Sequence, residues 1–320
     1  MSQRFFDENV YPAIGDSEIT ACRLCPRACG ADRKVQTGFC GCGGQVRAAR
    51  AALHHWEEPW ISGVNGSGTV FFSGCTLRCC FCQNYSISQE NYGKALNGEA
   101  LADVFLRLQD QGAHNLNLVT ATQFLPWILP ALDRVRHRLK IPVVYNTGGY
   151  ERVETVNALK DYVDVWLPDL KYFDPGLSAR FSEAADYFDV ASRAVEQMIR
   201  QTGTPRFTQV SKERPESPRL LNRGVIIRHM VLPGHKEDSV RLLGWMAENL
   251  PRGQYFVSLL SQYTPYRQNP RYPELNRRVT SYEYGKVVDA ALALGLDQGF
   301  MQKKTSAREA YTPPFDLEGL

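Results

Sequence analysis

Residues 73–84 of the chain read SGCTLRCCFCQN, and this stretch decides how the rest of the sequence is interpreted. Three of its cysteines, Cys75, Cys79 and Cys82, have the spacing C-x3-C-x2-C, with an aromatic residue before the last. Thiolates are soft ligands that select iron–sulfur clusters, zinc or copper. Most iron–sulfur clusters are held by four protein thiolates, so three ligands would leave one iron of a four-iron cluster open to a small molecule. Cys80 does not fit both spacings and is expected to be a packed or redox-sensitive spare thiol.

Two other interpretations of this stretch have less support. A structural zinc site usually has four ligands in paired short spacings. Buried structural cysteines are common, but four cysteines within residues 75–82 are improbable by chance.

The spacing resembles the signature of the radical S-adenosylmethionine (SAM) superfamily. The resemblance implies that Cys75, Cys79 and Cys82 hold a 4Fe-4S cluster, and that the amino and carboxylate groups of SAM chelate the open iron. An electron then cleaves the sulfonium and yields the 5'-deoxyadenosyl radical.

Composition places the chain among ordinary globular proteins. Of 320 residues, 43% are apolar and 22% are charged, which argues against disorder and against a fibrous chain. The apolar runs are shorter than a membrane span and the start lacks the layout of a signal peptide, so we expect a cytoplasmic protein without a membrane partner. A formal net charge of +3 is too small to indicate nucleic acid. Nine clustered cysteines favour metal ligation in a reducing compartment over disulfides.

The first segment, residues 1–52, is predicted to be a small module held by a metal. It lacks a long periodic apolar pattern, and such modules are normally stabilised by a metal or cluster. The spacing C-x2-C-x3-C-x10-C supplies four thiolates, with Cys42 as an alternative to the last; they are Cys22, Cys25, Cys29 and Cys40. A second 4Fe-4S cluster and a structural zinc both suit this set.

Residues 53–304 alternate short β-branched runs with amphipathic helical patterns. The candidate strands are 69–73, 115–120, 142–146, 163–167, 224–232 and 254–260. The candidate helices are 100–111, 126–138, 153–162, 185–201, 236–250 and 281–294. Strand–helix units of this length form parallel sheets with right-handed crossovers. Six units predict an α/β fold, an open (β/α)6 partial TIM barrel (the radical SAM core), with its site at the carboxyl ends of the strands. Residues 305–320 are predicted to form an extended tail over the barrel.

The segment after the second predicted strand, residues 119–126, is polar at the expected rim. Its position resembles that of the "GGE" motif, which holds the amino group of SAM in radical SAM enzymes. The glycines and the acid are absent here, so the resemblance would assign neutral acceptors to this role: Thr120, Thr122 and Gln123. Alternatively, Thr122 is a helix N-cap.

The third and fourth predicted strands end in YNTGGYE, residues 145–151, and WLPDLK, residues 166–171. These resemble the "DTNG" and "DLK" segments of pyruvate formate-lyase activating enzymes. The resemblance places Asn146, Thr147 and Asp169 around a monovalent cation and Lys171 on the SAM carboxylate. Asn146 stands where the family has Asp, so one negative charge is missing. Alternatively, the two glycines form an ordinary turn and the Asp and Lys a surface pair.

The fifth predicted strand contains VIIRHMVLPGH, residues 225–235, and resembles the "RYVVVPG" segment whose arginine reaches the cofactor. Arg228 in an apolar strand is costly to bury unless it is paired, and the carboxylate of SAM would be a suitable partner. The ending of the sixth strand resembles the "QY-x-P" segment of PflX-type relatives of these activating enzymes. At the rim, His235, Gln262 and Tyr263 are assigned to substrate.

These resemblances cover nearly the whole chain and imply reductive cleavage of SAM, with a reductant such as flavodoxin or ferredoxin. One hypothesis is an enzyme that abstracts hydrogen from a peptide, protein or small-molecule substrate. A second is an activase that installs a glycyl radical on a partner protein, although residues 83–99 are short and lack the cysteines of the insert that carries auxiliary clusters in such activases. A third is a non-catalytic iron–sulfur electron carrier.

Overall fold

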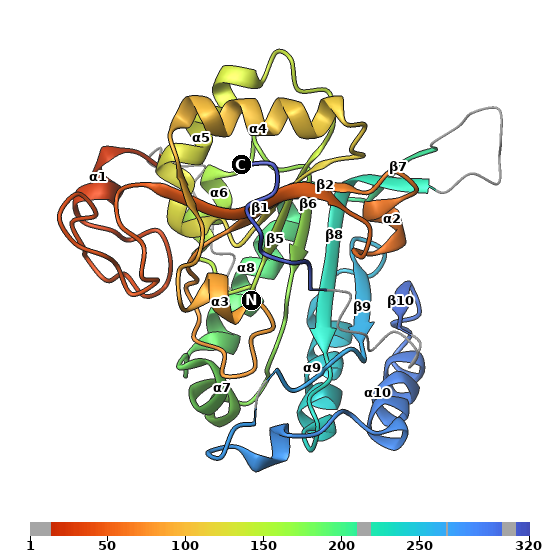
Figure 1. The fold of residues 1–320 in the computed structure, drawn as a ribbon. Helices are drawn as coiled ribbons and strands as arrows, with labels where there is room; N and C mark the ends of the chain where they lie inside the picture. Colours follow the sequence, from red (N-terminus) through yellow and green to blue (C-terminus); the bar gives the residue numbers. More distant parts are fainter. Residues whose placement is uncertain (1–13, 210–218, 267, 303–311) are drawn as a thin grey trace, which may run out of the picture.

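The computed structural model describes residues 14–209, 219–266, 268–302 and 312–320. Residues 1–13 of the predicted N-terminal module and 305–311 of the predicted tail lie outside the described residues. The described strands form one ten-stranded sheet, in which nine follow the order β10-β9-β8-β6-β5-β4-β2-β1-β3 and β7 pairs with β8 (Figure 1).

Parallel strands separated by helices make up the centre of the sheet, as predicted. The six expected strands are β2 (Ser67–Phe72), β4 (Leu116–Val119), β5 (Val143–Thr147), β6 (Val165–Pro168), β8 (Arg219–Met230) and β9 (Phe256–Leu260). The six expected helices are α4 (Gly98–Asp110), α5 (Leu125–Val135), α6 (Val153–Ala158), α8 (Tyr187–Thr202), α9 (Lys236–Asn249) and α10 (Ser281–Ala293). Neighbouring strands of this set pair in parallel. The open (β/α)6 partial TIM barrel is therefore confirmed.

The structure also contains elements that the sequence did not predict. β1 (Val46–His54) pairs antiparallel with β2, and β3 (Lys94–Leu96) pairs antiparallel with β1. β10 (Gly299–Met301) adds a parallel strand beside β9. The other additional elements are α1 (Asp16–Thr20), α2 (Pro59–Ser62), α3 (Tyr85–Ser88), η1 (Thr122–Phe124), α7 (Pro175–Ser182), β7 (Arg206–Gln209) and η2 (Pro273–Leu275). β1 is rich in alanine, which is depleted in strands, and it crosses the predicted boundary between residues 52 and 53.

Apolar side chains fill one end of the barrel interior. Because side chains alternate along a strand, every second residue of the central strands points inward. One buried cluster comprises Ile61, Val144, Val165, Leu167, Leu221 and Ile226. Trp60 of α2 packs edge-on against this layer, with ring centroids 4.7 Å from Phe256 and 4.5 Å from Phe300. This layer fills the barrel around α2 and leaves the polar side chains to the carboxyl ends of the strands.

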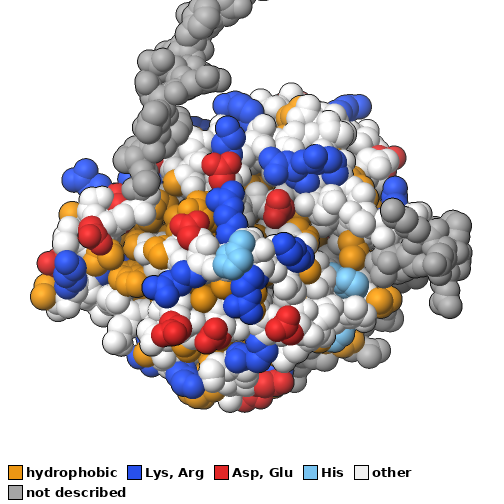
Figure 2. Space-filling view, turned by 90° about the horizontal axis from the view of Figure 1, so that it is seen from above, with side chains coloured by type: hydrophobic (Ala, Val, Ile, Leu, Met, Phe, Trp, Pro, Cys, Tyr) orange, Lys and Arg blue, Asp and Glu red, His pale blue; other side chains and the backbone are white. Residues whose placement is uncertain are grey.

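The outer surface carries mixed charges. On the face shown in Figure 2, Lys and Arg side chains are interspersed with Asp and Glu side chains, as expected for a solvated surface. Of the helices in the described ranges, none has both the length and the apolar character needed to cross a membrane.

Residues 312–320 run beside β1, where Figure 1 places the C-terminal end of the chain. The Leu317 amide donates a hydrogen bond to the Ala49 carbonyl at 3.0 Å, and the Ala51 amide donates to the Glu318 carbonyl at 2.9 Å. These two bonds extend the edge of the sheet beyond β3, so the described part of the tail is anchored on β1.

Replacing Gly319 should weaken this anchoring. Gly319 has φ +70°, and a Cβ atom there would lie 1.9 Å from the Ala51 carbonyl oxygen. We expect Gly319→Ala to cost about 1–3 kcal/mol of docking free energy and to accelerate hydrogen exchange of residues 312–320 roughly tenfold or more. Gly98→Ala is the matched control, because Gly98 has open space around its Cβ position. Equal exchange in Gly319→Ala and the unmodified protein would contradict the docking.

Candidate functional site

The loop that follows β2 holds three thiols supported by hydrogen bonds. Each sulfur accepts a bond: Cys75 from the Leu77 amide at 3.4 Å, Cys79 from the Ser182 hydroxyl at 3.0 Å, and Cys82 from the Ser88 hydroxyl at 3.2 Å. Donors of this kind orient metal-ligating thiolates and tune the metal. The arrangement therefore fits the donor set of an iron–sulfur cluster.

Burial raises the pKa of the thiols of Cys75, Cys79 and Cys82. Buried thiols lose their protons when a positively charged metal group binds them. No three of the described His, Cys, Asp and Glu side chains converge tightly enough to bind one metal ion. A cluster poses a different requirement, because its thiolates bind separate irons.

Cys80, which the sequence analysis expects to be a spare thiol, differs in its contacts from Cys75, Cys79 and Cys82. Its side chain is absent from the lining of the adjacent cavity, and its amide donates a hydrogen bond to the Phe181 carbonyl at 2.8 Å. Burial raises its pKa to about 11.

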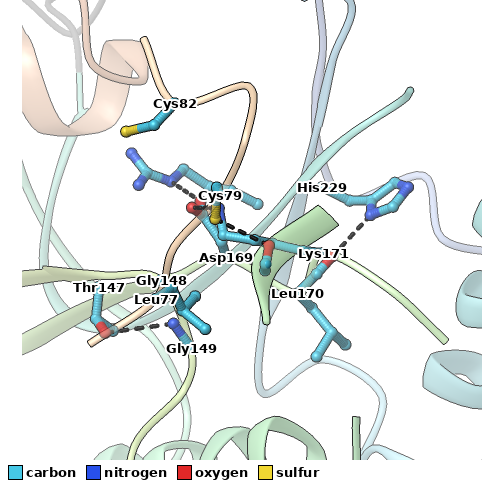
Figure 3. A network of polar contacts seen from close by, with 12 residues as sticks. Leu77, Cys79, Cys82, Thr147, Gly148, Gly149, Asp169, Leu170, Lys171 and His229 are labelled. Carbon is cyan, nitrogen blue, oxygen red and sulfur yellow. Dashed lines mark hydrogen bonds and ion pairs between the residues drawn. The ribbon is translucent and has the colours of Figure 1, made fainter. Parts of the chain in front are cut away.

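Cys79 and Cys82 line a cavity of about 230 Å³ at the carboxyl ends of the strands. The charged side chains of Asp169, Lys171 and Arg228 form one wall of this cavity. In Figure 3 Cys79 lies close to Asp169 and Lys171, and these two charges act on the Cys79 thiol. Further lining residues come from β1, the loop after β1 and the tail; they are His54, Trp56, Glu57, Thr312 and Pro313.

The charges of this wall form a partly buried network. Arg228 pairs through Nε with Asp169 Oδ1 at 3.1 Å and through Nη1 with Glu57 Oε2 at 3.2 Å. Lys171 Nζ pairs with the other Asp169 oxygen at 2.5 Å. Burial alone would raise the pKa of Asp169, but Lys171 and Arg228 hold that pKa below its usual value. Burial also acts to lower the pKa of Arg228, and Asp169 and Glu57 outweigh it.

Glu57 is a site residue that the sequence analysis did not identify. Its Oε1 accepts hydrogen bonds from the side-chain amides of Asn117 and Asn146, both at 3.1 Å, and Asn146 Oδ1 in turn accepts a bond from Arg228. Glu57 lies in the loop between β1 and α2. The sequence contains only an indirect signal for Glu57, because an arginine within an apolar strand needs carboxylate partners. The sequence does not indicate which carboxylate contacts Arg228.

Gln123 does not line the cavity; its side chain instead binds the backbone of the cysteine loop. Its side-chain amide donates hydrogen bonds to the carbonyls of Ser73 at 2.9 Å, Gly74 at 3.1 Å and Thr120 at 2.7 Å. Thr120 has φ +56° and its amide donates to the Asn146 carbonyl. These contacts fix the backbone that leads into Cys75.

Thr122 and Thr147 meet at one buried carboxylate. The Thr122 hydroxyl donates to Glu151 Oε1 at 2.7 Å, and the Thr147 hydroxyl donates to the same atom at 2.5 Å. Burial raises the pKa of Glu151 to about 7. Neither threonine lines the cavity, and Thr122 does not act as a helix N-cap, since Ala121 occupies that position of η1.

The three residues assigned to substrate lie in different places. Gln262 lines the cavity and accepts a hydrogen bond from the Gln302 amide at 2.8 Å. The Tyr263 hydroxyl instead donates to the Leu275 carbonyl at 2.7 Å. His235 packs edge-on against Phe181, with ring centroids 5.3 Å apart. Tyr263 and His235 are not in the cavity lining.

Four cysteines of the N-terminal module are neighbours. A Cβ atom on Gly38 would lie 3.3 Å from the Cys29 sulfur and 3.6 Å from the Cys40 sulfur. The Cys25 thiol interacts electrostatically with Cys40 and Cys22, and Cys22 interacts with Cys29.

Cys42 points toward the loop after β2. Its thiol donates a hydrogen bond to the Ser73 carbonyl at 3.4 Å, and a Cβ atom on Gly74 would lie 2.1 Å from its sulfur. A hydrogen bond from the Cys42 thiol lowers the pKa of Cys40 to about 6. Cys42 therefore lies between the module and the residue before Cys75.

Arginine side chains fasten the module to this loop. Arg27 donates from Nε to the Thr76 carbonyl at 3.0 Å and stacks over the Phe39 ring at 4.1 Å. Arg78, inside the loop, donates to the Phe39 carbonyl at 2.8 Å. Arg33, which is 1% exposed, donates to the Gln123 carbonyl at 2.9 Å. The two groups of cysteines are thus held side by side.

Residues 69–210 match the model of the Radical SAM superfamily. An uncharacterized protein of Methanocaldococcus jannaschii, MJ0674, is 29% identical over 285 residues, which cover 86% of this chain and 75% of that protein.

Solved structures of SuiB from Streptococcus suis are also similar. The form bound to S-adenosylmethionine has a TM-score of 0.46 and 14% identity, covering 72% of this chain and 48% of that chain. The form bound to precursor peptide SuiA has a TM-score of 0.45 and 14% identity, covering 71% and 46%. The chain therefore spans about half the length of SuiB. The segment that matches the Radical SAM superfamily, residues 69–210, contains the C-x3-C-x2-C loop that follows β2.

Proposed function

We propose that this protein is a radical SAM enzyme that abstracts a hydrogen atom from a peptide or small-molecule substrate. The observation that carries the proposal is the set of three thiols, one buried and two partly buried, each with a hydrogen-bond donor, beside a cavity with a charged wall. When bound, a 4Fe-4S cluster supplies the electron that cleaves SAM to the 5'-deoxyadenosyl radical; the protein supplies binding, orientation and exclusion of water.

Different residues around the cavity would bind the cluster and SAM. Cys75, Cys79 and Cys82 would hold three irons and leave the fourth to SAM. Lys171 would bind the SAM carboxylate, because its ammonium lines the cavity and lies within electrostatic range of all three thiols. A charge-assisted hydrogen bond to a carboxylate suits a compact ammonium.

Arg228 would provide positive charge where the activating enzymes hold a monovalent cation. Its guanidinium contacts Asn146 and Asp169, two of the three residues that the resemblance places around the cation. The third, Thr147, is bonded to Glu151. This arrangement supports a PflX-type relative in which an internal guanidinium takes the place of the cation.

The N-terminal module would hold a second 4Fe-4S cluster through Cys22, Cys25, Cys29 and Cys40. The proximity of these four sulfurs supports Cys40 as the fourth ligand, since Cys42 is turned toward Ser73. Zinc on the same ligands is the alternative outcome of the metal analysis below.

Anaerobic reconstitution tests the proposed activity. With iron, sulfide, SAM and dithionite, the protein should release 5'-deoxyadenosine and methionine, measured by chromatography. Cys79→Ala should abolish both products, because it removes a ligand of the cluster. Cys80→Ser is the matched control and should retain them. If the reconstituted unmodified protein forms neither product, the proposed function is wrong.

Removing the Lys171 charge should weaken SAM binding. A hydrogen bond to a charged group contributes about 1.5–3 kcal/mol, so Lys171→Met should raise the Kd for SAM about tenfold to a hundredfold in equilibrium binding. Lys286→Met, on the exposed surface, should leave the Kd unchanged. An unchanged Kd in Lys171→Met with intact iron content would exclude the assigned role.

Metal analysis of combined variants tests the second site. A Cys75/Cys79/Cys82 triple alanine variant should retain roughly four irons per chain, as a four-iron cluster requires. Adding Cys40→Ala should remove them, and adding Cys42→Ala should not. Residual zinc without iron would reject the cluster, and iron lost only with Cys42→Ala would reverse the choice of ligand.

A further inference from the structure

A second cavity lies beside the first, on the open side of the barrel. It has a volume of about 630 Å³ and lies between residues 55–59 and the strands β9 and β10. The two cavities share lining residues, which are Trp56, Glu57, Arg228, Leu260 and Gln262. A molecule in the second cavity would therefore adjoin whatever the first cavity holds.

Glu58 lines the second cavity and is unusual among its carboxylates. The residue is only 7% exposed, and its Oε2 atom is buried without a hydrogen-bond partner among the described atoms. Its other contact is a hydrogen bond with Ser258 of β9. A buried carboxylate with an unpaired oxygen is costly, so this position calls for a partner.

The charges around the two cavities do not balance. Arg228 pairs with Glu57 and Asp169, and Lys171 pairs with Asp169. Both cations are thus paired with the carboxylates of Glu57 and Asp169, whereas Glu58 takes part in no ion pair within the described ranges. Of the three carboxylates that line the two cavities, Glu58 is therefore the one without an ion pair among the described residues.

We propose that the second cavity binds the ammonium or guanidinium group of a cationic substrate, through the carboxylate of Glu58. Aromatic rings of Trp56 and Phe300 line the same cavity and suit the alkyl stem or face of such a group. Gln262 and Gln302, which are hydrogen-bonded to each other, also line the second cavity, and Gln262 lines the first as well. Their amides can bind polar atoms farther along the substrate. That this ligand is the substrate rests on the proposed function, because the adjoining cavity is assigned to SAM.

The proposal has a pH signature. Burial raises the pKa of Glu58; Arg228 acts to lower it and Glu57 raises it further. Its neighbours in the lining also include His55. A cation binds Glu58 in its ionised form. At low pH, where Glu58 is protonated without ligand, binding of the cation therefore releases that proton. Affinity should rise with pH until Glu58 is ionised without ligand, and fall up to tenfold per pH unit below that point.

Simple cations test the site directly. The probes are n-butylammonium and n-butylguanidinium, with 1-butanol as their neutral counterpart, and saturation-transfer NMR on the full chain measures binding. We expect both cations to bind more tightly than butanol, and Glu58→Gln to weaken them at least tenfold. Glu248→Gln, an exposed carboxylate on α9, is the matched control and should bind them normally. Equal binding of the cations by Glu58→Gln and the unmodified protein, or butanol binding as tightly, would overturn the proposal.

A second measurement needs no variant and covers the case in which Glu58→Gln fails to fold, which thermal unfolding reveals. Between about pH 5 and pH 9 the affinity of the unmodified protein for n-butylguanidinium should rise with pH, by up to tenfold per pH unit while Glu58 is protonated without ligand; a flat profile would overturn the proposal. Cleavage of SAM is assayed in parallel. Lost cation binding with intact SAM cleavage rejects only the cation site, and the converse rejects only the proposed function.

Discussion

Burial of the Arg228 guanidinium inside the sheet is the constraint on which the rest of the site depends. An unpaired charge at this depth would cost several kcal/mol, and the chain surrounds it with Asp169, Glu57 and Asn146. The residue that follows β6, the loop after β1 and strand β5 are thereby tied to β8. Lys171 joins through Asp169, which fixes an ammonium beside the cysteines. The network explains why the wall of the cavity is charged although the interior beneath it is apolar.

The cysteine loop is fixed from two sides. Gln123 bonds the backbone before Cys75 from beneath, and Arg27 and Arg78 join the loop to the N-terminal module through Phe39. The Cys42 side chain packs against Gly74, where a larger residue would have no room for its side chain. Gly74 also has φ +76°, a conformation that favours glycine. The N-terminal module is too small for a core of its own and is stabilised by its contacts with the barrel. The same contacts hold the cysteine loop in place.

The sequence predicted the periodic features well, and the reasons are physical. The spacing of Cys75, Cys79 and Cys82 and the six parallel strands follow from local patterns, and Asp169, Lys171 and Arg228 meet because carboxyl ends of parallel strands share one edge. β1 was not predicted because an alanine-rich strand lacks a strong local signal. β10 was not predicted because three residues are too few to show a periodicity. Glu57 could not be found, since its role exists only through a distant arginine. For the same reason the sequence does not reveal that Gln123 contacts the backbone of the cysteine loop and Thr122 contacts Glu151, and neither lines the cavity.

The account's central claim is that SAM binds an iron left open by three thiolates. Electron paramagnetic resonance of the dithionite-reduced Cys40→Ala variant, recorded with and without SAM, tests this most directly, because it isolates the cluster at Cys75, Cys79 and Cys82. The account predicts the signal of a reduced 4Fe-4S cluster whose g-values change when SAM is added. A cluster signal that SAM leaves unchanged would contradict it.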